Sequence, residues 1–201
     1  MEEKYLVFTG RPNAGKSSII KEIIGIDLKI GKRPGTTRKI SKYPLNEGLV
    51  LVDMPGFGRM LGVSKRWEDI INNRIVRFLE SNAQSIVVAV HVLDISTFLE
   101  VTRRLEKKGF ISVDVETVLF LNKILGELPF IAANKIDKAD EIEIDDNLSE
   151  FINQIKEGYP SDVTDFIFPV SAKTGERLSS LKNAIHKKLV VKGFRTPFKI
   201  R

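Results

Sequence analysis

Buried-strand patterns and helical patterns alternate along most of this chain, and that alternation limits the fold more than any other feature of the sequence. Unbroken apolar runs are typical of strands that are buried on both faces. The expected strands are Tyr5–Thr9, Leu49–Asp53, Ile86–Leu93, Leu128–Ala133 and Asp165–Val170, with a possible edge strand near Ser41–Leu45. Helical spacing of apolar residues predicts helices over Lys16–Gly25, Arg66–Ser81, Leu99–Lys108, Val115–Leu125, Leu148–Glu157 and Leu178–Val190. The sequence therefore predicts an α/β fold of three layers, in which helices cover both faces of a mostly parallel central sheet.

The composition fits a globular domain and excludes several kinds of site. Of the 201 residues, 42% are hydrophobic and 29% are charged, so a full core can form. Because the chain has no cysteine and only two histidines, a disulfide framework, a thiol nucleophile, thiolate-bound zinc and a multi-histidine metal site are excluded. The longest apolar stretch, Ile86–Leu93, is too short to cross a bilayer, and the first residues lack the pattern of a signal peptide. We expect one cytoplasmic domain with no membrane partner.

The charge is uneven along the chain, although the net charge is only +6. Lys29–Lys42 holds six basic residues and no acid, and Lys182–Arg201 holds seven basic residues and no acid. By contrast, Asp137–Glu150 holds seven acids against one lysine. A solvated face is the ordinary interpretation of each run, and contact with a polyanion is the alternative for the two basic ones.

The segment after the first expected strand has the pattern of a phosphate-binding loop. It reads Gly10-Arg-Pro-Asn-Ala-Gly-Lys-Ser17 and fits G-x-x-x-x-G-K-S/T. Glycines in such a loop let backbone N–H groups turn towards phosphate oxygens, and the following helix presents its positive N-terminal end to the same anion. Lys16 can reach the β- and γ-phosphates, and the Ser17 hydroxyl can ligate Mg²⁺. A turn that merely caps a helix is the alternative, which the flanking strand and helix make weaker.

A second motif follows the second buried strand, where Asp53-Met-Pro-Gly56 begins a loop rich in proline and glycine. A carboxylate at this strand end points towards the phosphate loop and can hold Mg²⁺ through water. Gly56 lets a backbone N–H approach a terminal phosphate closely. Taken alone, the pattern fits an ordinary turn at a strand end equally well. After a phosphate loop, it predicts a loop that could change shape with the bound nucleotide.

Two further strand ends carry residues that can select guanine. Asp137, in Asn134-Lys-Ile-Asp137, can accept two hydrogen bonds from the N1–H and 2-amino groups of guanine, and adenine offers neither donor. The Lys135 stem can lie across the base plane, and Asn134 can tie this loop to the phosphate loop. Backbone N–H groups of Ser171-Ala-Lys173 can meet the guanine carbonyl, although a plain turn is the usual interpretation of that tripeptide alone. In this order, each at a strand end, the motifs predict a guanine-nucleotide site.

Together these motifs resemble those of translation-factor-related GTPases, and a lone domain of this size is most similar to the EngB (YihA) family in the group of TrmE, Era, EngA and EngB. The resemblance rests on Gly10–Ser18, Lys32–Arg38, Asp53–Gly58, Asn134–Asp137 and Ser171–Lys173. It implies one P-loop GTPase G domain over residues 1–201, with a basic C-terminal tail from about residue 190. It also implies a link to assembly of the large ribosomal subunit.

The resemblance implies a role for each matching residue. Lys16 would bind phosphate, Ser17, Thr37 and Asp53 would hold Mg²⁺, and Lys16, Thr37 and Gly56 would serve catalysis. Two nucleotide-dependent switch loops would span Lys29–Lys42 and Asp53–Lys65. The expected contacts to GTP or GDP come from Gly10, Asn13, Ala14, Gly15, Lys16, Ser17, Ser18, Gly35, Thr36, Thr37, Asp53, Gly56, Asn134, Lys135, Asp137, Ser171, Ala172 and Lys173.

Phe57 departs from the better-known GTPase pattern. Many GTPases place a water-orienting glutamine there, and phenylalanine can neither orient nor polarise water. EngB-like proteins share a hydrophobic residue at this position, so we expect slow GTP hydrolysis that a partner or an ion could stimulate. An asparagine corresponding to Asn13 helps to bind K⁺ in the TrmE-like loop, which suggests stimulation by K⁺. The alternative is that Asn13 only stabilises the turn.

Three classes of function follow from these patterns. The first is a slow GTPase switch, a monomer whose basic runs dock on ribosomal RNA of the large subunit in the GTP state. The second is a regulatory GTP-binding module that acts on a protein effector with negligible turnover. The third, an ATP-using P-loop enzyme, is disfavoured by Asp137.

Several conspicuous residues have an ordinary structural interpretation. His91 lies in an apolar strand and is expected to be a hydrogen-bonded core residue rather than an acid or base. Trp67 is expected to pack against the fold. Arg11, Arg38 and Arg59 lie near the proposed phosphates, but nothing in the sequence indicates that one of them acts as an arginine finger.

Overall fold

A computed structural model describes residues 2–26, 39–57, 65–107 and 109–198, apart from the side chain of Trp67. The predictions for Gly35, Thr36, Thr37, Arg38 and Arg59 lie outside the described residues, as do large parts of both expected switch loops. The packing predicted for Trp67 also lies outside them.

The described chain contains a central sheet in the order β2-β3-β1-β4-β5-β6. The strands are β1 (Lys4–Gly10), β2 (Ser41–Pro44), β3 (Leu49–Asp53), β4 (Ile86–Asp94), β5 (Phe130–Asn134) and β6 (Ile167–Val170). Neighbours are parallel except for the edge pair β2 and β3, which is antiparallel. All five residues of β3 are buried, which explains why the strands read as continuous apolar runs. The mostly parallel sheet and its edge strand are confirmed.

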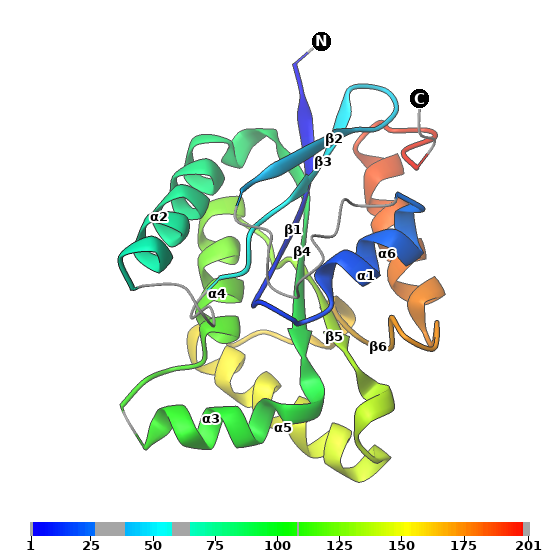
Figure 1. Ribbon diagram of the computed structural model, residues 1–201. Coiled ribbons are helices and arrows are strands. Elements are labelled where there is room, and N and C mark those ends of the chain that lie inside the picture. The colour runs from blue at the N-terminus through cyan, green and yellow to red at the C-terminus, as the bar shows by residue number, and fades with distance from the viewer. Residues whose placement is uncertain (1, 27–38, 58–64, 108, 199–201) are drawn as a thin grey trace.

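Helices cover both faces of this sheet (Figure 1). They are α1 (Lys16–Ile24), α2 (Lys65–Ser81), α3 (Phe98–Glu106), α4 (Val113–Leu125), α5 (Glu141–Gly158) and α6 (Leu178–Val191). Alternate residues of β1 point to opposite faces: Leu6 and Phe8 pack with α1 and α6, whereas Tyr5 and Val7 pack with α2 and α4. Helix α5 packs beside α4 on the second face. The three predicted layers are confirmed. No described helix is long and apolar enough to span a membrane.

Helix α5 corrects one prediction, because it begins at Glu141 rather than Leu148. The Asp140 carboxylate accepts a hydrogen bond from the Glu143 N–H at 2.8 Å, and the Glu143 carboxylate accepts one from the Asp140 N–H at 3.3 Å. This capping box satisfies two amide groups that the first turn would otherwise leave unpaired. The acidic run therefore starts the helix, where negative charge also interacts favourably with the helix dipole.

Two strand boundaries also differ from the predicted ones. Strand β5 begins at Phe130 instead of Leu128, and the intervening Pro129 has no N–H to donate to the sheet. Strand β6 begins at Ile167 instead of Asp165, because Thr164–Phe166 form a short 3₁₀ turn. The Asp162 carboxylate accepts the Thr164 N–H at 3.0 Å and stabilises the start of that turn.

The described part of the expected C-terminal tail packs against the domain. Helix α6 runs to Val191, and Phe194 is buried in the core that α1 and α6 share. The Thr196 N–H donates to the Glu47 carboxylate at 3.2 Å, in the turn between β2 and β3. Residues from about 190 to 198 are thus held to the fold by apolar and polar contacts.

Candidate functional site

The loops that carry the predicted motifs lie at one edge of the sheet. Strands β1, β3, β5 and β6 are all parallel, so their carboxyl ends meet there. The first loop, Gly10–Gly15, follows β1, and Asp53–Gly56 follows β3. Asn134–Asp137 ends and follows β5, and Ser171–Lys173 follows β6. The edge formed by the carboxyl ends of parallel strands is where open α/β sheets bind ligands.

The Gly10–Gly15 loop turns into α1 through a left-handed residue. Gly15 has a φ of 96° and precedes Lys16, the first residue of α1, and no side chain caps this helix. A Cβ at Gly15 would collide with the Asn134 side-chain nitrogen, so the position requires glycine for both its angle and its close approach. The uncapped N-terminal end of α1 is a favourable place for an anion.

The loop after β3 lies directly against the phosphate loop. The Phe57 N–H donates to the Gly10 carbonyl oxygen at 3.0 Å. A Cβ at Gly56 would come within 2.6 Å of the Pro12 nitrogen, so glycine is what permits this approach. The half-buried Phe57 ring packs against the core cluster that contains Val52 and Met54.

Lys16 and Asp53 form a buried ion pair between these two loops. The Lys16 ammonium group donates a hydrogen bond to the Asp53 carboxylate. Only 8% of the Lys16 side chain and 4% of the Asp53 side chain are exposed. Because both charges are removed from water, each depends on the other for compensation. The half-buried Ser17 follows Lys16 on the first turn of α1.

Asn134 connects three of the four loops. Its buried side-chain amide donates to the Ala14 carbonyl oxygen at 2.8 Å, in the phosphate loop. Its side-chain oxygen accepts the Ala172 N–H at 3.0 Å, in the loop after β6. The motif predicts the link to the phosphate loop, and the structure adds the second link.

Asp137 and Ser171 form a polar pair beside this connection. The Ser171 hydroxyl donates to one Asp137 carboxylate oxygen at 2.6 Å, and the other oxygen is buried without a hydrogen-bond partner. That hydrogen bond holds the pKa of Asp137 below its usual range, Lys173 and Lys138 add to the lowering, and burial opposes it. Asp137 is therefore a negatively charged acceptor with unused capacity, as recognition of two adjacent N–H donors requires.

Asp94 belongs to none of the predicted motifs, yet it contacts one of them. It ends β4, and its carboxylate accepts hydrogen bonds from the Lys135 ammonium group and, at 2.7 Å, from the Ser96 hydroxyl. Lys135 itself has a φ of 74°, which is uncommon for a residue with a side chain. The position of Asp94 at a strand end, like that of Asp53, was the available signal.

A second buried network lies beneath the phosphate loop. The Arg11 guanidinium contacts the fully buried Asp114 at 2.7 Å, and Asp114 also contacts the His91 ring at 3.1 Å. The other ring nitrogen of His91 lies 3.0 Å from the Thr9 hydroxyl. His91 is thus a hydrogen-bonded core residue, as predicted. The structure pairs Arg11 with the N-terminal turn of α4, and no sequence motif indicated this role for Asp114.

The structure brings the described motif residues together at one edge. Gly10, Ala14, Gly15, Lys16, Asp53, Gly56, Asn134, Lys135, Asp137, Ser171, Ala172 and Lys173 all take part in the contacts between these loops or lie in them. Asn13 is exposed at the tip of the phosphate loop with a φ of 65°, and Ser17 and Ser18 lie on the first turn of α1.

Comparison with known proteins identifies the family. Residues 5–135 match a family model described as "50S ribosome-binding GTPase". A relative from Methanopyrus kandleri, described as a probable GTP-binding protein EngB, is 41% identical over 192 residues that cover 94% of each chain. The chain belongs to the EngB family of GTPases. Its fold is accordingly the P-loop GTPase G domain, and its activity is hydrolysis of GTP.

Solved structures agree with this assignment. A crystal structure described as a probable GTP-binding protein EngB is 36% identical and has a TM-score of 0.78, with 93% of this chain and 99% of that chain covered. Era, solved with MgGDPNP and a segment of 16S ribosomal RNA, has a TM-score of 0.61 at 24% identity, with 94% of this chain and 57% of that chain covered. The likeness to Era concerns the fold alone.

The donor chemistry of the site suits Mg²⁺. Ser17 and Asp53 supply a hydroxyl and a carboxylate, which are the hard oxygen donors that this ion prefers. Within the described ranges, no group of three or more histidine or acidic side chains could hold a metal by itself. Such a sparse set fits an ion that keeps several waters and binds phosphate oxygens.

Replacement of Asn134 by alanine is expected to weaken both the fold and nucleotide binding. The Ala14 carbonyl and the Ala172 N–H would lose their partners, which costs about 2–4 kcal/mol of unfolding free energy. GTP affinity is expected to fall by roughly tenfold, because two loops of the site lose their connection. Urea unfolding and titration with a fluorescent GTP analogue measure the two effects.

Asn147→Ala is the matched control for this variant. Asn147 is buried, accepts the Leu99 N–H at 2.7 Å and donates to the Glu143 carbonyl at 2.7 Å, but it lies in α5 away from the nucleotide loops. The Asn147→Ala variant is expected to lose about as much unfolding free energy as Asn134→Ala, but its GTP affinity should remain that of the wild type. Equal GTP affinities for the two variants would contradict the connecting role of Asn134.

Replacement of Ser171 by alanine is expected to change the pH dependence of GDP binding. Without the hydroxyl the pKa of Asp137 rises, so the carboxylate becomes protonated at a higher pH than in the wild type. For each protein, GDP affinity is expressed relative to its value at neutral pH. As the pH is lowered, this relative affinity should therefore begin to fall at a higher pH in the variant than in the wild type. Titration of both proteins with fluorescent GDP between neutral pH and about 3.5, a range that includes the ordinary aspartate pKa of about 3.9, tests this. Because nucleotide phosphates titrate equally in both series, parallel profiles would refute the prediction.

Proposed function

We propose that this EngB-family protein is a slow GTPase that acts as a nucleotide-dependent switch in assembly of the large ribosomal subunit. The observation that carries the proposal is the convergence at one sheet edge of a glycine-rich loop and an ionised Asp137, one of whose oxygens accepts no hydrogen bond and lies 3.7 Å from the Lys173 ammonium group. Asn134 links the two. The description of the matching family model, "50S ribosome-binding GTPase", supports a partner in the large ribosomal subunit.

The mechanism we propose relies on positioning and charge. The Lys16 ammonium group would hold the β- and γ-phosphates, and the Gly56 N–H would approach the γ-phosphate. Ser17, Thr37 and Asp53 would hold Mg²⁺, which neutralises developing charge on the phosphates when it is bound. Phe57 packs its ring on the core and cannot orient water, which supports slow turnover. The exposed Asn13 would bind K⁺, so we expect faster hydrolysis in KCl than in NaCl.

A nucleotide titration of the purified protein tests the core of this proposal. GTP and GDP are expected to bind at least about 10³-fold more tightly than ATP, because adenine offers Asp137 no donor. Mg²⁺ should increase the affinity for GTP. Equal binding of ATP and GTP would overturn the assignment of the base site.

Association with large ribosomal subunits tests the partner. We propose that the chain acts in the cytoplasm as a monomer and a single G domain over residues 1–201, and that its basic runs contact ribosomal RNA. Exposed Lys182, Lys187 and Lys192 lie in or just after α6 and support such a surface.

Pelleting with large subunits should require GTP rather than GDP and weaken with salt. A plot of log affinity against log salt concentration has a negative slope. Replacing these lysines with glutamine should reduce the magnitude of that slope by about 2–3, because fewer phosphates are neutralised.

Lys107, Lys123 and Lys156 provide the control, because they are exposed but lie outside both basic runs and both expected switch loops. Their replacement with glutamine removes the same charge and is expected to change the salt slope less. The alternative function, a regulatory module for a protein effector, predicts no association with subunits even at low salt.

A further inference from the structure

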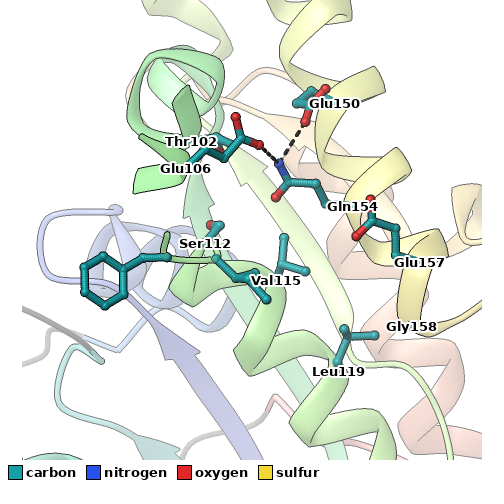
Figure 2. A pocket seen from close by; sticks show the side chains of 11 residues that line it. Thr102, Glu106, Ser112, Val115, Leu119, Glu150, Gln154, Glu157 and Gly158 are labelled. Atoms are coloured by element: carbon teal, nitrogen blue, oxygen red, sulfur yellow. Dashed lines mark hydrogen bonds between the residues drawn. The ribbon is translucent and has the colours of Figure 1, made fainter. Parts of the chain in front are cut away.

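A cavity of about 340 Å³ between α3, α4 and α5 lies outside the nucleotide site. Its lining residues are Thr102, Glu106, Phe110, Ile111, Ser112, Val115, Leu119, Glu150, Gln154, Glu157 and Gly158. One side of the cavity is polar and acidic, and Val115 and Leu119 of α4 form an apolar side (Figure 2). Cavities of this size accommodate a small ligand or an inserted side chain.

The polar side contains acceptors that the fold leaves unsatisfied. Thr102 is 2% exposed, and its hydroxyl oxygen has no hydrogen-bond partner. The Gln154 side-chain oxygen is also buried and unpartnered, while its nitrogen donates to Glu106 at 3.4 Å and to Glu150 at 2.8 Å (Figure 2). Buried polar atoms are nearly always satisfied in folded proteins, so this arrangement points to a ligand that brings donors.

The charge of the cavity defines the ligand further. Glu106, Glu150 and Glu157 contribute three carboxylates, and none of the described lining residues is basic. No cluster of three or more metal-ligating side chains exists in the described ranges, so the carboxylates do not converge on a metal ion. A cation with several N–H donors satisfies both the carboxylates and the unpartnered oxygens, and a guanidinium group carries five such donors.

The rim of the cavity indicates that the cation belongs to a protein. Phe110 and Ile111 stand at its edge with 61% and 62% of their surfaces exposed, although apolar residues of this size are usually covered. An arginine stem could lie along Val115 and Leu119, and an apolar neighbour of that arginine could cover Phe110 and Ile111. Nucleic acid would be repelled by the glutamates, and a small polyamine would leave the rim uncovered.

We propose that this cavity is a docking site for a protein segment that presents an arginine next to a large apolar side chain. The cavity glutamates complement the charge of the arginine, and the exposed Phe110 and Ile111 would be covered by its apolar neighbour. The site is separate from the proposed RNA contacts, so its test does not depend on them.

An amide NMR titration of the full chain with the acetylated peptide Gly-Ser-Arg-Leu-Ser-Gly tests the proposal. Saturable shifts are expected at Thr102, Phe110 and Gln154. A peptide with citrulline, which keeps the shape of arginine without its charge, should bind roughly tenfold more weakly. A peptide with serine in place of leucine should also bind more weakly.

Variants of the chain complete the test. Glu106→Gln combined with Glu157→Gln is expected to lower peptide affinity by roughly tenfold, and Phe110→Ser by roughly threefold. The matched controls are Glu100→Gln on the exposed face of α3 and Val191→Ser at the end of α6, which should not change it. All these side chains are exposed, so the variants should remain folded, which GDP binding and the amide spectrum verify.

Four outcomes would overturn the proposal. The first is equal binding of the arginine and citrulline peptides. The second is binding of spermidine at the same residues as tightly as the peptide, which would make the cavity a small-cation site. The third is the absence of localised shifts up to millimolar peptide. The fourth is the appearance of shifts at these residues on addition of an RNA oligonucleotide.

Discussion

Asp137→Asn is expected to lower the affinity for GTP by roughly 10³-fold and to increase the affinity for XTP. Asparagine replaces a charged acceptor by a side chain that offers one carbonyl oxygen and one NH₂ group. It therefore loses an acceptor for the guanine donors and gains a donor for the carbonyl oxygen that xanthine carries in place of the 2-amino group. Competition titrations with GTP, XTP and ATP against a fluorescent nucleotide measure the change.

The fold should tolerate Asp137→Asn. The asparagine carbonyl can still accept the hydrogen bond from the Ser171 hydroxyl, so unfolding by urea is expected near that of the wild type. Unchanged preference for GTP over XTP in this variant would show that Asp137 does not contact the base. ATP should remain a poor ligand in both proteins, which separates a change of base preference from a general loosening of the site.

Lys16→Met is expected to reduce nucleotide affinity by about 10²-fold and to destabilise the nucleotide-free protein by about 3–5 kcal/mol. The first effect follows from loss of a charged donor to phosphate. The second follows because the variant leaves the buried Asp53 carboxylate without its partner. Titration with fluorescent GDP and urea unfolding in the absence of nucleotide measure the two effects separately.

The double variant Lys16→Met with Asp53→Asn distinguishes the two causes. It removes both charges, so most of the lost unfolding free energy should return. Nucleotide affinity should not return, since neither the phosphate donor nor the carboxylate proposed for Mg²⁺ is restored. If the single variant were as stable as the wild type, the ion pair would not be the compensated buried pair that its burial indicates.

Helix α5 shows a feature that the local sequence signals, and the Asn134–Asp137 loop shows one that arises only from tertiary contacts. The acidic residues from 137 to 150 are typical of a solvated face, and the apolar spacing predicts a helix only from Leu148. The capping box of Asp140 and Glu143 was present in the sequence as a signal for an earlier start. By contrast, nothing local indicates that Asn134 also accepts the Ala172 N–H, because that contact joins segments brought together by pairing of β5 with β6.

Continuous apolar runs and glycine-containing loops at their ends were enough to predict a parallel sheet with the nucleotide motifs on one edge, since parallel strands place their carboxyl ends together. Only the tertiary structure revealed the pairing of Arg11 with Asp114, the role of Asp94 and the cavity beside Gln154. The first joins the phosphate loop to α4, the second joins the end of β4 to the loop after β5, and the cavity lies between α3, α4 and α5. Such side-chain contacts are determined by the packing of segments that are distant in the sequence, and no periodicity or motif along the chain predicts them.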